Sequence, residues 1–121
     1  MSAALAIALS AADARQWLRL RQLRVQRARQ ALAEAQAAQV QALAAVEDRE
    51  LRVAQGRRRL DELARHWGGP GSVDMPRWGG QLQAHRDAVS ERLERDEYAL
   101  IDEQEALDQA QAVVRQRRAE L

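Results

Sequence analysis

The sequence has no cysteine and no phenylalanine, and its 121 residues include only one tyrosine, two prolines and six glycines. The absence of cysteine excludes a disulfide framework and thiol chemistry, and it is compatible with a reducing compartment. Aromatic residues make up 3% of the chain, and nearly all the other apolar residues are Ala, Leu and Val. A thick globular core is hard to build from these side chains, so the composition favours a thin architecture.

Long apolar runs and an excess of one charge are also lacking. No apolar run approaches the roughly 18 residues needed to span a bilayer, so we expect a soluble protein. Nineteen basic residues, all arginine, face 18 acidic ones, and the formal net charge is +1. Bulk charge therefore does not point to nucleic acid or a membrane surface. The abundant residues are Ala, Leu, Glu, Gln and Arg, which are typical of long helices and coiled coils.

The first half of the chain carries an apolar residue at nearly every seventh position. A stripe with a period of 3.5 residues keeps one face of a helix against a partner helix. We interpret the polar exception, Gln39, as a residue that fixes the register. The second row of the heptad includes Arg49 and Gly56 but is mostly small, which lets two helix backbones approach closely. The predicted apolar seam of the first helix comprises Leu18, Val25, Leu32, Val46, Val53 and Leu60.

A Gly/Pro-rich segment interrupts the pattern after Trp67. Glycine supplies a helix cap and proline cannot continue the backbone hydrogen bonds. Asp74 before Pro76 is a signal for a new helix, but the glycines that follow weaken it, so we expect a stable second helix only from about Gln81. The predicted segments are a flexible N-terminus over 1–12, a long helix over 13–67, a turn over 68–80 and a second helix over 81–121.

The second helix repeats the seven-residue period. Two helices with the same period, joined by about a dozen residues, are expected to fold back on each other. The predicted fold is therefore all-α, a long two-helix antiparallel coiled-coil hairpin that forms one domain over 13–121. The first helix is longer by roughly a dozen residues, so part of its N-terminal end is expected to project unpaired or to meet a partner. The predicted seam of the second helix comprises Leu93, Leu100, Leu107 and Val114.

No arrangement of residues in the sequence predicts an enzyme. Two packed helices enclose no site in which acids, bases or metal ligands could converge. His66 and His85 are the only histidines, and neither has a second histidine at metal-binding spacing. The acidic run from Asp96 to Asp108 is best explained as a solvated face, since it lacks the glycine-centred loop of a calcium site. We therefore predict no catalytic residue, no cofactor and no metal.

Charge is distributed unevenly along the chain. Arginines crowd the beginning of the first helix and the end of the second, and an antiparallel hairpin places both groups at one end. This basic end is either a solvated surface with weak ion pairs or a surface that steers docking onto an acidic protein. Nucleic-acid binding is less favoured, because it calls for aromatic residues for stacking, and this end has only Trp17. The candidate contact residues are Arg19, Arg24 and Arg27 with Arg115 and Arg118.

Two tryptophans lie at the predicted turn, one just before it and one near its end. Trp67 and Trp78 either pack on each other and close the hairpin, which we favour slightly, or anchor a partner at this tip.

The segment from Trp17 to Leu32 resembles the start of the YscO/FliJ family, the stalk proteins of type III secretion and flagellar export (SctO-like proteins). The match lies in the pattern Leu-Arg-Val-x-Arg-Ala. It covers roughly the first third of the chain, and the rest agrees in architecture only. The second helix is shorter than is usual in this family and the turn is richer in glycine. The matching residues are Leu23, Arg24, Val25, Arg27 and Ala28.

The resemblance implies a cytoplasmic coiled coil whose paired ends enter the hexameric export ATPase, so the basic end would face that ring. The body or tip would reach toward the export gate, and some members also bind secretion chaperones. Contact with the membrane would be only indirect, through the export apparatus, and no nucleic acid is expected. Two other functions stay open at this point: a coiled-coil adaptor or oligomerisation protein with an unrelated partner, and a helical nucleic-acid-binding arm.

Overall fold

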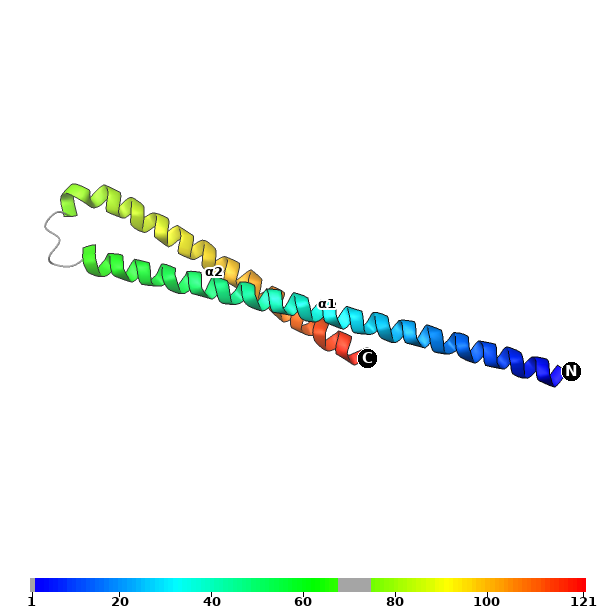
Figure 1. Ribbon diagram of the computed structural model, residues 1–121. Coiled ribbons are helices and arrows are strands. Elements are labelled where there is room, and N and C mark those ends of the chain that lie inside the picture. The colour runs from blue at the N-terminus through cyan, green and yellow to red at the C-terminus, as the bar shows by residue number, and fades with distance from the viewer. Residues whose placement is uncertain (1, 68–74) are drawn as a thin grey trace. The chain divides into compact units, whose positions relative to one another are not determined.

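The structure, a computed structural model, describes residues 2–67 and 75–121, and it describes side chains for residues 10–66 and 79–121. It contains two helices, α1 (Ser2–Trp67) and α2 (Met75–Ala119) (Figure 1). The described ranges contain no strand. The predicted all-α helical hairpin is thus confirmed. Within the described residues, neither helix contains a stretch that is both long enough and apolar enough to span a bilayer.

Both helices begin earlier than the sequence predicted. Helix α1 starts at Ser2 instead of Asp13, because the Ala- and Leu-rich opening consists of strong helix formers. Residues 2–12 are therefore part of the long helix and not a separate irregular segment. Helix α2 starts at Met75, directly after Asp74, so the start signal outweighs the two glycines that follow it. Basic residues occupy the last turn of each helix, where they interact favourably with the helix dipole.

The chain divides into two compact units, where we had predicted a single domain. The first unit combines Met1–Gln39 with Ala110–Leu121, and the second comprises Val40–Gln109. The division arises because two long helices form only local contacts along their length, so no central core ties one end of the pair to the other. Each unit contains a segment of α1 and a segment of α2.

In the second unit, α1 and α2 pack antiparallel along the predicted seam. Val46, Val53 and Val89 are buried, with Val53 only 4% exposed. The antiparallel direction follows from the contacts, since Gly56 of α1 lies against Leu93 of α2 and Arg49 lies against residues further along α2. The remaining predicted seam residues of this unit are half-buried: Leu60, Leu93, Leu100 and Leu107.

In the first unit, the seam is short. Ala35 and Val114 are buried and Leu32 is half-buried. Two predicted seam residues are not: Leu18 is 58% exposed and Val25 is 39% exposed. The heptad stripe continues through them in the sequence, but no described residue of α2 covers them. In this structure Leu18 and Val25 thus lie outside the packed seam, on a part of α1 that is exposed from residue 10 to residue 27.

Truncation of Val53 tests where the stabilising burial lies. We expect Val53→Ala to lower the free energy of unfolding by about 1 to 3 kcal/mol, because it removes two buried methyl groups and leaves a gap in the seam. The matched control is Val40→Ala, since Val40 is 67% exposed and its truncation should change stability by no more than about 0.5 kcal/mol. Urea unfolding followed by circular dichroism measures both. Equal losses in the two variants would contradict the seam.

Candidate functional site

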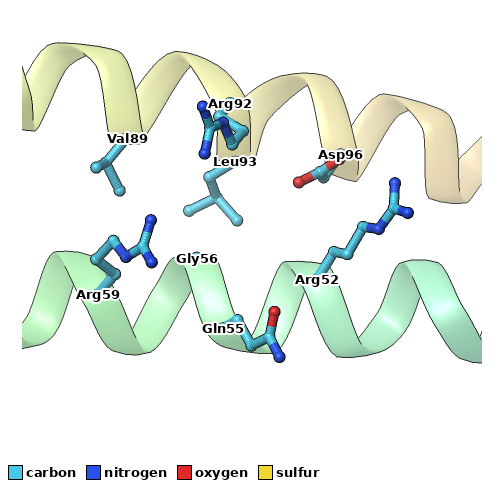
Figure 2. A pocket seen from close by; sticks show the side chains of 8 residues that line it. All are labelled: Arg52, Gln55, Gly56, Arg59, Val89, Arg92, Leu93 and Asp96. Carbon is cyan, nitrogen blue, oxygen red and sulfur yellow. The ribbon is translucent and has the colours of Figure 1, made fainter.

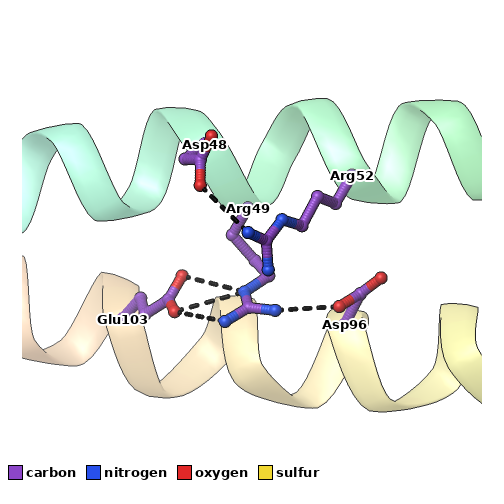
Figure 3. A network of polar contacts seen from close by, with 5 residues as sticks. All are labelled: Asp48, Arg49, Arg52, Asp96 and Glu103. Atoms are coloured by element: carbon purple, nitrogen blue, oxygen red, sulfur yellow. Dashed lines mark hydrogen bonds and ion pairs between the residues drawn. The ribbon is translucent and has the colours of Figure 1, made fainter.

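A network of ion pairs crosses the seam of the second unit (Figure 3). Arg49 of α1 reaches between Asp96 and Glu103 of α2. Its Nη1 donates to Asp96 Oδ1 at 2.8 Å, and its Nη2 donates to Glu103 Oε1 at 3.0 Å. Its Nε also donates to the two carboxylate oxygens of Glu103, at 3.2 and 3.3 Å. One guanidinium thus holds two carboxylates through its fork of donors, the geometry that gives arginine pairs their directionality.

The environment of Arg49 favours its charged form. Hydrogen bonds to Glu103 and then to Asp96 raise the pKa of Arg49 above its usual value, although partial desolvation opposes them. Two other ion pairs of this unit are more exposed and longer: Arg52 with Asp48 on the same helix, and Arg57 with Glu97 across the seam, both at 3.5 Å. Exposed pairs of this kind contribute little to stability. Arg49 is therefore the polar anchor of the seam.

The spacing of the two carboxylates makes this network specific for one register. Asp96 and Glu103 are seven residues apart, one heptad. If α2 slid by one heptad, Val89 or Ala110 would replace one of the two carboxylates, and Arg49 would lose half of its partners. An apolar seam with leucines every seven residues loses less on such a slip, because apolar residues again face apolar residues. The Arg49 network thus selects among registers that the apolar repeat leaves similar.

The helices approach closely at Gly56, as the small second row of the heptad predicted. A Cβ atom built on Gly56 would lie 3.1 Å from Leu93 Cδ1. Beside this contact is an open cleft of about 330 Å³ (Figure 2). Its only carboxylate, Asp96, is already bound by Arg49, so these lining residues form no acid–base pair for catalysis. The cleft is lined by Arg52, Gln55, Gly56, Arg59, Val89, Arg92, Leu93 and Asp96.

The two histidines lie on one cleft, which the sequence analysis did not predict. His66 of α1 and His85 of α2 line an open space of about 490 Å³ together with Arg59, Glu62 and Leu63. Their proximity depends on the pairing of α1 with α2, so spacing along one helix could not reveal it. The predicted antiparallel pairing could have indicated this proximity, because it places residues just before the turn opposite residues just after it. Across the side chains that the structure describes, no group of three or more His, Asp and Glu residues could hold a metal ion.

The residues predicted to contact an ATPase all belong to the first unit and are largely accessible. Arg19, Arg24 and Arg27 are exposed on α1, and Arg115 and Arg118 are exposed on α2. The sequence analysis missed how much apolar surface accompanies them. Trp17 is 70% exposed, and four neighbouring aliphatic side chains are also exposed. The uncovered beginning of α1 therefore combines positive charge with apolar surface, a combination typical of an interface. The exposed aliphatic residues are Leu18, Leu20, Leu23 and Val25.

The predicted tip residues lie outside the described side chains. Trp67 is the last residue of α1, and Trp78 is the fourth residue of α2. Their role as a partner anchor stays a prediction.

Comparison with known proteins gave no relatives: no family model, no curated protein and no solved structure matches this chain.

Replacement of Arg49 tests the polar anchor. We expect Arg49→Gln to lower the midpoint of thermal unfolding clearly more than Arg52→Gln does, because Arg49 bridges two helices and Arg52 pairs within one. The loss should shrink if Asp96→Asn and Glu103→Gln are added, since the two carboxylates are then no longer left without their partner. Thermal unfolding monitored by circular dichroism provides the comparison. Equal effects of the Arg49 and Arg52 substitutions would refute the anchor.

Alanine substitutions at two glycines test the close approach at Gly56. Gly80→Ala should stabilise α2 by about 1 kcal/mol, because alanine is the better helix former and no atom lies within 4 Å of the new methyl group. Gly56→Ala should gain less, since the terminal methyl group of Leu93 must move by a few tenths of an ångström to make room. Urea unfolding measures both changes. A gain at Gly56 as large as that at Gly80 would show that the helices are not in tight contact there.

Proposed function

We propose that this chain is a stalk protein of a type III secretion or flagellar export apparatus, which links the hexameric export ATPase to the export gate. In this proposal it acts in the cytoplasm, reaches the membrane only through the apparatus, and also binds secretion chaperones. It works by binding other proteins and not by catalysis. The observation that carries the proposal is the uncovered beginning of α1, where exposed arginines accompany exposed apolar side chains.

The arrangement of this surface supports docking onto an acidic protein. Six arginines and no acidic residue lie between positions 15 and 29. Such a charge density steers association with a surface of opposite sign. The apolar residues among them, Trp17 and Leu23 in particular, supply area that gains free energy when a partner covers it. A single helix with these properties suits insertion into a groove or ring lined by carboxylates.

The sequence resemblance covers this same surface. The pattern Leu-Arg-Val-x-Arg-Ala, which resembles the start of the export stalk proteins, spans Leu23 to Ala28. Arg24 and Arg27 within it are exposed. Val25 is also partly exposed, although it was expected in the seam. The residues that carry the resemblance are therefore available to a partner, together with Arg19, Arg115 and Arg118.

Binding to an export ATPase tests the proposal. The chain should bind the hexameric ATPase of its own organism and stimulate ATP hydrolysis. The triple variant Arg19→Glu, Arg24→Glu and Arg27→Glu should weaken binding by roughly 100-fold, because like charges then face each other across the interface. Isothermal titration calorimetry and a phosphate-release assay measure the two effects.

The matched control carries the same change of charge elsewhere. Arg58→Glu, Arg65→Glu and Arg86→Glu alter three exposed arginines of the second unit and should leave ATPase binding unchanged. Equal loss in both variants would indicate a nonspecific effect of net charge. Affinity for nucleic acid that falls steeply with the logarithm of salt concentration, with no ATPase binding, would favour a nucleic-acid-binding arm instead. Absence of both would leave an adaptor with another partner.

A further inference from the structure

The chain carries two exposed surfaces of opposite charge, both of which contain apolar residues. The first, here called the basic arm, is residues 15–29 of α1. Its six arginines are exposed, and none is ion-paired within the part of the chain whose side chains are described. Trp17, Leu18 and Val25 lie among them with much of their surface accessible. The described residues of this chain thus leave the basic arm largely exposed.

The second surface, here called the acidic face, is the side of α2 that points away from the seam over residues 91–108. Tyr98 and Ile101 are exposed there, Tyr98 at 65%. Five exposed carboxylates surround them at spacings of three and four residues, which places all seven side chains on one face of the helix. None of the five is ion-paired to another described residue. They are Glu91, Glu94, Asp102, Glu105 and Asp108.

The two surfaces match in pattern and in length. On the acidic face, Glu94 stands four residues before Tyr98 and Glu105 stands four residues after Ile101, so an apolar pair has a carboxylate on each side. On the basic arm, Arg21 and Arg24 stand between apolar residues. The arm is roughly 22 Å long and the acidic face roughly 27 Å, at 1.5 Å per residue. Apolar contact with flanking charges of opposite sign is the pattern of a helix–helix interface.

We propose that the basic arm of one copy docks on the acidic face of a second copy, and that the chain associates with itself through this contact. Docking of one arm on another is disfavoured, since six arginines of each copy would repel. The contact therefore joins two different surfaces of the same chain. It needs no second protein and does not depend on the proposed export function, although it uses the same part of α1.

Sedimentation equilibrium across protein and salt concentrations tests the contact. The wild-type mass should rise above the 13.6 kDa of one chain as protein concentration increases, and it should fall back at high salt, which screens exposed charges. Arg21→Glu with Arg24→Glu makes the arm acidic, and Glu94→Arg with Glu105→Arg makes the acidic face basic. Each double variant alone should raise the dissociation constant by about tenfold or more.

A mixture of the two double variants gives the decisive result. In the mixture, the acidic arm of one variant meets the basic face of the other, so association should return. The matched controls, Glu47→Arg with Glu50→Arg and Arg58→Glu with Arg65→Glu, change the same charges on exposed positions elsewhere and should associate like the wild type. Circular dichroism checks the helix content of every variant. If the arm variant with glutamates loses helix content, Arg21→Gln with Arg24→Gln takes its place.

Several results would overturn the proposal. A wild-type chain that stays monomeric at every concentration has no such contact. Association that persists in both double variants uses another surface, and a mixture that stays monomeric shows that the two surfaces do not pair. Association that disappears on nuclease treatment depends on bound nucleic acid and not on a second copy.

Discussion

The burial of one narrow apolar stripe per helix is the constraint on which this structure depends. Among the described side chains, only small and medium apolar ones are buried: Val46, Val53 and Val89 in the second unit, and Ala35 and Val114 in the first. Each buried valine contributes at most a few kcal/mol, and the ordering of each residue opposes it. All the larger aliphatic side chains that are described are half-buried or exposed. Most of the surface of both helices is consequently free to carry charge and to contact partners.

Because the apolar seam is thin, the register between the two helices depends strongly on polar residues. Aliphatic side chains at intervals of seven define a face but discriminate weakly between registers one heptad apart. Arg49 supplies the missing discrimination, because its two partners stand one heptad apart and a shift of α2 by one heptad in either direction replaces one of them with Val89 or Ala110. Gly56 adds a steric element, since it lets Leu93 approach within van der Waals distance of the α1 backbone. Stability and specificity thus come from different residues of the same interface.

The two proposed interaction surfaces lie beyond the end of the seam on α1 and on the side of α2 opposite the seam. The beginning of α1 is exposed from residue 10 to residue 27. It therefore retains a continued heptad stripe with arginines around it, and both proposed interactions use this stripe. The outer side of α2 bears carboxylates that the seam does not use. Exposed charges of one sign attract surfaces of the other, so the two proposed partners, an export ATPase and a second copy, would compete for the arm.

The sequence by itself determined the helices, their antiparallel pairing and most of the seam. The seven-residue repeat can be recognised within a single segment of sequence, so Val46, Val53 and Val114 could be assigned to the seam from their spacing alone. It could not show where the repeat stops being buried, because burial depends on the length of the facing helix. Leu18 and Val25 continue the repeat and are nevertheless exposed. Helix α2 begins at Met75, earlier than the glycine content of this segment predicted.

Only the tertiary structure decided which residues of α1 meet which residues of α2. The bridge from Arg49 to Asp96 and Glu103 joins residues 47 and 54 positions apart, and the shared cleft of His66 and His85 likewise spans the turn. Such pairs depend on the register between two helices, and a repeat with a period of seven is compatible with more than one register. The sequence pattern gives the spacing within each helix, but it does not give the position of one helix relative to the other.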